Sequence, residues 1–116
     1  MDANEMINRT KQFAVDCGHL ILSLPNNVIN HAYSAQLIQS SSSVGANYRS
    51  TRRAKSTADF ISKFKIVEEE LDESLFFLEL IMDFNKDKKE KIAKIYKEGE
   101  QLLKMIVASL KTLRKG

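Results

Sequence analysis

Four cations lie within seven residues in the middle of the chain, with no acid among them and with several hydroxyl side chains nearby. Guanidinium groups donate paired hydrogen bonds that match phosphate oxygens, and hydroxyls can add further contacts. This composition predicts a contact for the sugar-phosphate backbone of a nucleic acid, to which Lys63 and Lys65 could add. The basic cluster consists of Arg49, Arg52, Arg53 and Lys55.

A second interpretation of the basic cluster is a solvated face that pairs with acids of the same or an adjacent subunit. An acidic run follows on the next segment, and surface ion pairs of this kind are common and weak. For a single chain the two interpretations stay open. In a symmetric oligomer the cluster would be repeated, and multivalency would favour a polyanion. The acidic run consists of Glu68, Glu69, Glu70, Asp72 and Glu73.

Other residue types that could do chemistry are isolated from one another. His19 and His31 have no cysteine or carboxylate at the spacing of a metal site. The acidic run lacks the Glu-x-x-His pair that metal sites in helix bundles use, so we interpret it as a solvated face. Cys17 falls among apolar residues and is expected in the core. No glycine-rich phosphate loop or nucleophile elbow is present. We expect no enzymatic activity, no metal and no cofactor.

The elements that position these residues are expected to be helices. The 116 residues suit one domain, spanning 1–116, and they include only one proline and four glycines. The single cysteine fits a reducing compartment, and the N-terminal segment is polar and mixed in charge. No apolar run reaches the roughly 20 residues that span a bilayer. We therefore expect a cytoplasmic protein that does not contact membranes.

Apolar residues recur at steps of three and four, and no strand alternation is visible. Pro25 ends the first periodic segment, the stretch Asn85–Asp87 ends the third, and asparagine, serine or threonine side chains are available as caps. Short connections make consecutive helices antiparallel. The sequence therefore predicts an all-α, up-down-up-down four-helix bundle with helices at roughly 5–24, 28–50, 57–84 and 88–114.

The serine-rich segment from Ser40 to Asn47 can be interpreted in two ways. A flexible linker would leave nearly 30 structureless residues inside a compact domain, which is uncommon. A helix built of small side chains would allow close packing against a neighbouring helix. We favour the helix. Its expected core-facing residues are Ile29, Ala32, Leu37, Ser41, Val44 and Tyr48, with Tyr48 in the core in preference to stacking on an unpaired base.

The stretch LFFLELIMDF, from Leu75 to Phe84, is apolar on almost every side of a helix. A bundle buries one stripe of each helix, so several of these side chains would remain exposed. They could form a thick edge of the core covered by another helix, or an interface between subunits. We favour the interface, and its expected residues are Phe76, Phe77, Leu80 and Phe84.

Several short motifs resemble one family of four-helix-bundle proteins, those encoded in intervening sequences of bacterial 23S ribosomal RNA genes. Its members share a Ser-Ile-Pro-Ala-Asn-like segment on the second helix and a Ser-x-x-Glu-Phe start to the third. The matching residues here are Gln36-Leu37, Ser43-Val44-Gly45-Ala46-Asn47, Ser56-x-x-Asp59-Phe60, Lys65-Ile66-Val67 and Asp72-Glu73-Ser74-Leu75.

The resemblance covers nearly the whole chain and implies a left-handed up-down bundle, often assembled into a ring of five, with no established catalytic activity. It also implies a distant relationship to the accessory protein of diversity-generating retroelements, a basic ring that works with nucleic acid and a reverse transcriptase. Two departures are visible. Gly45 stands where many members have proline, and Tyr48-Arg49-Ser50 replaces an Ile-Ala-Glu-like stretch, so the role of that glutamate cannot be transferred.

Two functional hypotheses follow for a homo-oligomer, with a pentamer expected from the resemblance. In the first, the basic cluster binds RNA or DNA phosphates without reading sequence. In the second, the oligomer is a scaffold that binds a protein partner through the acidic run and the aromatic residues, with no direct role for nucleic acid. We favour the first, because the cluster contains no acid.

Overall fold

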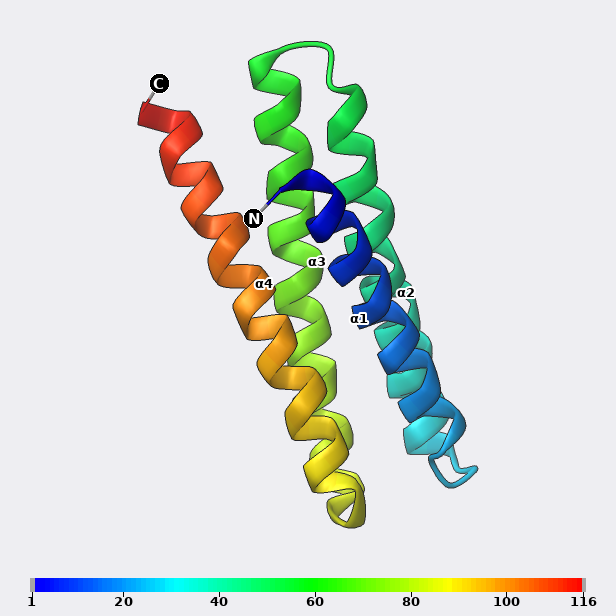
Figure 1. Ribbon diagram of the computed structural model, residues 1–116. Helices are drawn as coiled ribbons and strands as arrows, with labels where there is room; N and C mark the ends of the chain where they lie inside the picture. Colours follow the sequence, from blue (N-terminus) through cyan, green and yellow to red (C-terminus); the bar gives the residue numbers. More distant parts are fainter. Residues whose placement is uncertain (1, 116) are drawn as a thin grey trace.

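The computed structural model describes residues 2–115, and within them the chain forms helices and no strands. Four long helices lie side by side in a bundle of 47 × 21 × 20 Å, with consecutive helices running in opposite directions (Figure 1). The predicted all-α four-helix bundle is confirmed. The helices are α1 (Ala3–Leu22), α2 (Val28–Ser50), α3 (Thr57–Phe84) and α4 (Lys89–Lys115), with short 3-10 turns η1 (Thr51–Arg53) and η2 (Lys86–Lys88).

The left-handed sense of the bundle stays a prediction. The expected domain span of 1–116 includes Met1 and Gly116, which lie outside the described residues. Among residues 2–115 no helix is both long and apolar enough to cross a membrane.

Side-chain caps begin three of the helices. Asp2, Asn27 and Ser56 each accept a hydrogen bond from the backbone N–H three residues further on, at 2.8, 2.8 and 3.1 Å. These bonds satisfy amides that have no partner inside the helix. The first helix starts and ends two residues earlier than the predicted 5–24. It stops at Leu22 because Pro25 follows soon after, and helical backbone is disfavoured for the residue that precedes a proline.

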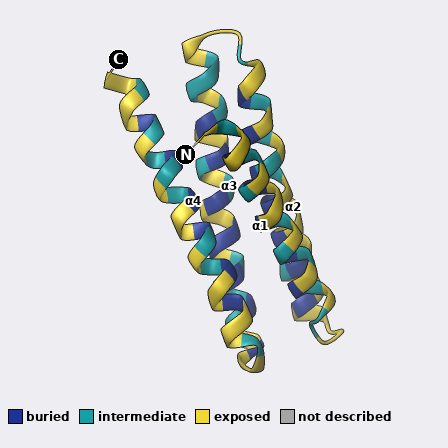
Figure 2. Ribbon diagram, in the orientation of Figure 1, coloured by how far each residue is buried: buried dark blue, intermediate teal, exposed yellow. Residues whose placement is uncertain are grey.

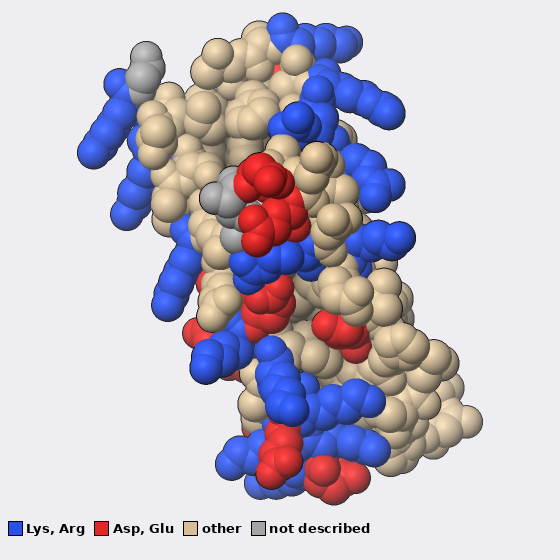
Figure 3. Space-filling model, in the orientation of Figure 1, with Lys and Arg blue, Asp and Glu red and all other residues tan. Residues whose placement is uncertain are grey.

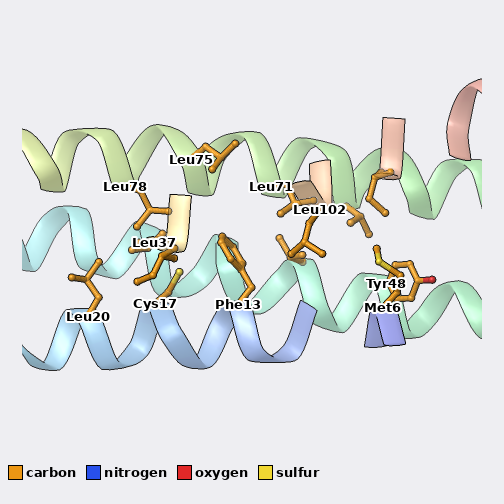
Figure 4. Packing of buried hydrophobic residues seen from close by; sticks show 14 of the residues in the cluster. Met6, Phe13, Cys17, Leu20, Leu37, Tyr48, Leu71, Leu75, Leu78 and Leu102 are labelled. Carbon is orange, nitrogen blue, oxygen red and sulfur yellow. The ribbon is translucent and has the colours of Figure 1, made fainter. Parts of the chain in front are cut away.

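Each helix buries one stripe of side chains between the four, while its outer face stays exposed (Figure 2). Phe13 and Cys17 from α1, Leu37 from α2 and Leu78 from α3 are buried together in the middle of the bundle (Figure 4). Large apolar side chains that are almost fully buried stabilise a fold by roughly 1.5–3 kcal/mol each. This continuous core fixes how the four helices sit relative to one another.

The serine-rich segment is helical throughout and lies in the middle of α2. Ser40 and Ser41 are both 0 % exposed, and Ser40 Oγ lies 2.9 Å from Ser74 Oγ of α3. Small side chains here let α2 and α3 approach closely, and this pair makes the most extensive contact between helices. The helical interpretation of the serines is confirmed, and the linker alternative is wrong.

The first half of α2 turns a different face inward from the one predicted. Ile29 is 37 % exposed and Ala32 is also exposed, whereas Asn30 and Ser34 are buried. Asn30 reaches across the bundle to Asn85, and their side-chain amides donate to each other at 3.1 and 2.8 Å. Each amide also donates to a backbone carbonyl, that of Pro25 or Ile81. The core position is polar because this pair is fully hydrogen-bonded, which apolar periodicity cannot indicate.

The seam between α1 and α4 is the smallest of the four helix contacts. Gly99 of α4 makes room there, because a Cβ at this position would come 3.0 Å from the Phe13 ring and 2.8 Å from a Leu75 methyl group. On the surface of the seam, the Arg9 guanidinium donates two hydrogen bonds to Glu98, at 2.9 and 2.5 Å.

Candidate nucleic-acid interface

The basic cluster lies at one end of the bundle, where the chain passes from α2 to α3. Arg49 belongs to the last turn of α2, Arg52 and Arg53 to η1, and Lys55 to the loop before α3. All four side chains are exposed. Within residues 2–115 none of them forms an ion pair or a side-chain hydrogen bond with the acidic run or with any other group. The side chains of the basic cluster therefore remain available to bind a partner.

A shallow hollow at this end brings three elements together. Its lining includes Arg52, the segment from Ala54 to Thr57, Phe60 and Leu113 near the end of α4. Thr51 is buried and its hydroxyl donates to the carbonyl of Tyr48, whereas Ser56 and Thr57 are exposed beside two cations and half-buried apolar side chains. Cations for phosphate oxygens and hydroxyls for additional hydrogen bonds are the groups that position a protein on a nucleic-acid backbone.

The start of α3 does not add a free anion site to this hollow. Ser56 caps it, and the Asp59 carboxylate accepts from the backbone N–H of Lys55 at 2.9 Å and from Lys63 Nζ at 3.1 Å. These hydrogen bonds, that from Lys55 first, hold the pKa of Asp59 below its usual range. The carboxylate already complements the positive end of the helix. Binding of a phosphate would therefore depend on the side-chain cations.

The sequence suggested three further residues for the surface of the basic cluster, of which one is available there and two are not. Lys65 is exposed and unpaired in the described part of the chain, whereas Lys63 is held by Asp59. Tyr48 is only 7 % exposed and packs edge-on against Phe64 with ring centroids 5.9 Å apart. Its position in the core leaves no face on which a base could stack.

Sequence reasoning missed one cation that the fold brings to the basic cluster. Lys11 of α1 lines the groove between α1 and α2 that also holds Arg49. Nothing in the spacing of residues 11 and 49 signals this proximity. It follows only from the pairing of the two helices.

Charge is distributed very unevenly along the bundle. Residues 49–67 and 101–115, which lie at the end with the basic cluster, hold ten Lys and Arg and one acid, a net charge of +9. Residues 2–11 of α1 also reach this end and add two cations and two acids, with no change in net charge. The remaining eight cations and fourteen acids give the rest of the chain a net charge of −6. In Figure 3, Lys and Arg side chains project on both sides of this end. The modest total of +3 therefore hides a strongly positive end.

The acidic run lies on α3 and begins at Glu68, directly after the segment 49–67 of the basic end. Glu69, Asp72 and Glu73 are exposed, while Glu68 and Glu70 are half-buried. Burial, and then repulsion by Glu73 and Glu69, raise the pKa of Glu70. No group of three or more His, Cys, Asp or Glu residues in the described range 2–115 is arranged to hold a metal ion.

The residues expected at a subunit interface differ in exposure. Phe76 and Phe84 are 54 and 57 % exposed, whereas Phe77 and Leu80 are half-buried. Tyr33 of α2 joins this group, with its ring centroid 6.2 Å from that of Phe77 and 5.9 Å from that of Phe84. We call these five residues the aromatic patch. In this patch Tyr33, Phe77 and Leu80 are half-buried, and the rings of Phe76 and Phe84 protrude from the surface.

The remaining candidates for chemistry lie apart. His19 and His31 are both exposed and lie on different helices, α1 and α2. Cys17 is 0 % exposed, and burial raises the pKa of its thiol to about 12. A thiol of this kind is a packing group and a poor nucleophile.

The four-helix architecture, the capped start of α3 and the small-residue contact of α2 coincide with the match to a known family. The family model described as 23S rRNA-intervening sequence protein matches residues 2–108. The chain belongs to this family. A solved structure similar to this family member is that of a protein of unknown function from the S23 ribosomal protein family of Bacteroides thetaiotaomicron.

The two chains are 29 % identical, and the alignment covers 96 % of this chain and 99 % of the Bacteroides chain with a TM-score of 0.84. A comparison with curated proteins finds no match. The likeness to the solved protein therefore extends over the whole bundle of the family member described here, and it carries no assigned activity with it.

Proposed function

We propose that this member of the 23S rRNA-intervening sequence protein family is a non-enzymatic protein that binds RNA or DNA through phosphate contacts of its basic end. The observation that supports this proposal most strongly is the net charge of +9 on residues 49–67 and 101–115, against −6 on the rest of the chain. Such a concentration of cations attracts polyanions even when the total charge is small. The unpaired state of the basic cluster supports the proposal, since free cations need no internal partner to be displaced.

The expected mode of binding is tolerant of sequence. The hollow offers cations and hydroxyls, which are the groups that contact the phosphate backbone and carry no sequence information. The affinity should fall steeply with salt because counterions are released when phosphates are neutralised.

Replacing Arg52 and Arg53 together with alanine tests this proposal. We expect a loss of affinity of roughly tenfold or more at about 100 mM salt, equal for all sequences, and a salt slope flatter by about 2. Anisotropy titrations with labelled 23S rRNA fragments and duplex DNA measure both. The matched control K88A/K89A removes two cations at the other end of the bundle and should have little effect. Equal weak binding by wild type and the R52A/R53A variant would reduce the cluster to a solvated surface.

We further propose that the chain assembles into a homo-oligomer, a pentamer by family resemblance, through the aromatic patch. Two phenylalanines that are more than half exposed on one helix face are costly in water and are typical of interfaces. The patch also adjoins the acidic run on α3. This placement favours a scaffold that contacts a protein partner as the second candidate function.

Changing Phe76 and Phe84 together to aspartate should separate the subunits while leaving the helical content and the melting temperature nearly unchanged. Their rings contribute little to the core of one chain. The control I66D places one such aspartate at a 40 %-exposed position of α3 outside the patch and should leave the oligomer intact. Size-exclusion chromatography with light scattering reports the mass. A wild-type chain that is monomeric at micromolar concentration contradicts the assembly.

A further inference from the structure

The outer face of α4 carries a row of lysines that neither the basic cluster nor the aromatic patch includes. Starting at position 94, steps of three and four residues reach Lys97, Gln101, Lys104, Ala108, Lys111 and Lys115, and every one of these residues is exposed. Steps of this size keep side chains on one face of a helix. The lysine row consists of Lys94, Lys97, Lys104, Lys111 and Lys115, with two neutral residues and no acid between them.

The usual explanation of exposed lysines on a helix is solubility, supported by glutamates four residues away. Part of the lysine row follows that pattern, because Glu90 and Glu98 lie four residues from Lys94 and Glu100 lies four residues before Lys104. Lys111 and Lys115 depart from it, with no acid within four residues. None of the lysines in the row forms an ion pair within residues 2–115. The exposed acids of the neighbouring helix, Glu69, Asp72 and Glu73, form no ion pair with the row either. Beyond Glu100, positive charge is therefore gathered along one edge of α4, in a segment, 101–115, that contains no acid.

The row also has the length of a nucleic-acid contact. Lys97, Lys104 and Lys111 recur every seven residues, so their Cα atoms rise by about 10.5 Å per step along the helix axis. From Lys94 to Lys115 the rise is roughly 31 Å, about the length of nine base-pair steps of a duplex. Over that length each strand winds through most of a turn, so a straight row of flexible cations would meet phosphates of both strands in succession.

The row and the basic cluster face different directions. In Figure 3, Lys and Arg side chains project along two opposite edges of the molecule, one along α4 and the other beyond the end of α2. A segment lying on one edge leaves the other free. We propose that the lysine row of α4 is a second contact for nucleic-acid phosphates, along which a duplex lies with its axis parallel to the helix. This inference rests on the proposed function and extends it to a separate surface.

The test compares wild type with the variant K97Q/K104Q/K111Q, using 20-base-pair RNA and DNA duplexes and anisotropy titrations over a range of KCl concentrations. Glutamine keeps the helix propensity of lysine. Loss of three contacts should weaken binding at least tenfold at about 100 mM salt and flatten the salt slope by about 2.7. The control K86Q/K88Q/K91Q removes the same charge from the turn at the start of α4, where Asp87 and Glu90 intervene, and should change affinity less than threefold.

Acetylation of lysines followed by mass spectrometry gives an independent reading. Bound duplex should protect Lys97, Lys104 and Lys111 from the reagent and leave Lys86 and Lys88 reactive. If both glutamine variants lose the same affinity, binding follows net charge and the row is overturned. If R52A/R53A loses affinity and K97Q/K104Q/K111Q does not, the row is overturned and the proposed function stands. Wild-type binding to phosphatidylserine vesicles without binding to either duplex overturns both.

Discussion

Replacing Ser40 with leucine is expected to lower the free energy of unfolding by about 3 kcal/mol, because the added side chain has no space between α2 and α3. Ser40 is 0 % exposed and faces Ser74, which is equally buried, with the two hydroxyl oxygens 2.9 Å apart. A leucine there must push the two helices apart along the most extensive contact of the bundle. Chemical denaturation followed by circular dichroism measures the change.

Two companion variants make the result specific. S40A removes only the hydroxyl, and Ser74 keeps its hydrogen bond to the carbonyl of Glu70 at 2.8 Å, so the expected cost is below about 1 kcal/mol. S42L places the same leucine two residues away on the exposed side of α2, where the expected change is within about 0.5 kcal/mol. A stability of S40L close to that of S42L would show that the serines do not set the distance between the helices.

Replacing Asn85 with leucine should cost about 3 kcal/mol, because Asn30 would remain buried without the partner that it now has. Asn30 and Asn85 are 2 and 3 % exposed and exchange two hydrogen bonds between the connections α1–α2 and α3–α4. N30L should cost a similar amount for the reciprocal reason. The measurement is again the free energy of unfolding from denaturant titration.

The double variant N30L/N85L decides whether the pair acts as a unit. It removes both amides, so no buried side-chain amide is left without its partner, and it should be less destabilised than the two single costs together by at least about 1 kcal/mol. Strictly additive costs would mean that each asparagine matters only through its own backbone contacts with Pro25 and Ile81.

The sequence was sufficient for the architecture because α1, α3 and α4 have clear apolar stripes, and because α1, α2 and α3 begin with good caps. It was also sufficient for the helical state of the serine segment, because a structureless loop of that length is uncommon inside a compact domain. The prediction of which face of residues 29–34 points inward was wrong for a physical reason. There a polar pair occupies the core, and its two members are 55 residues apart, so no local periodicity can reveal them.

The candidate site was predictable only in part. The basic cluster is contiguous in sequence, so Arg49, Arg52, Arg53 and Lys55 could be found by composition, although the binding that we propose for them is a separate question. The approach of Lys11 to Arg49, and of Leu113 to the hollow, depends on helix pairing. The lysine row has a sequence signature, but its meaning requires knowing that this face of α4 is the exposed one.

The small seam between α1 and α4 has a consequence for how the chain folds and opens. All three larger contacts join helices that follow one another in sequence, so each can form as a local hairpin without closing a long loop. Topologies of this kind fold quickly, in microseconds to milliseconds. Only the seam closes the whole chain into a ring of helices, and it does so with Phe13 against Gly99 and Arg9 on Glu98. We therefore expect the contact between α1 and α4 to form last during folding. We also expect it to open first in local fluctuations of the native bundle.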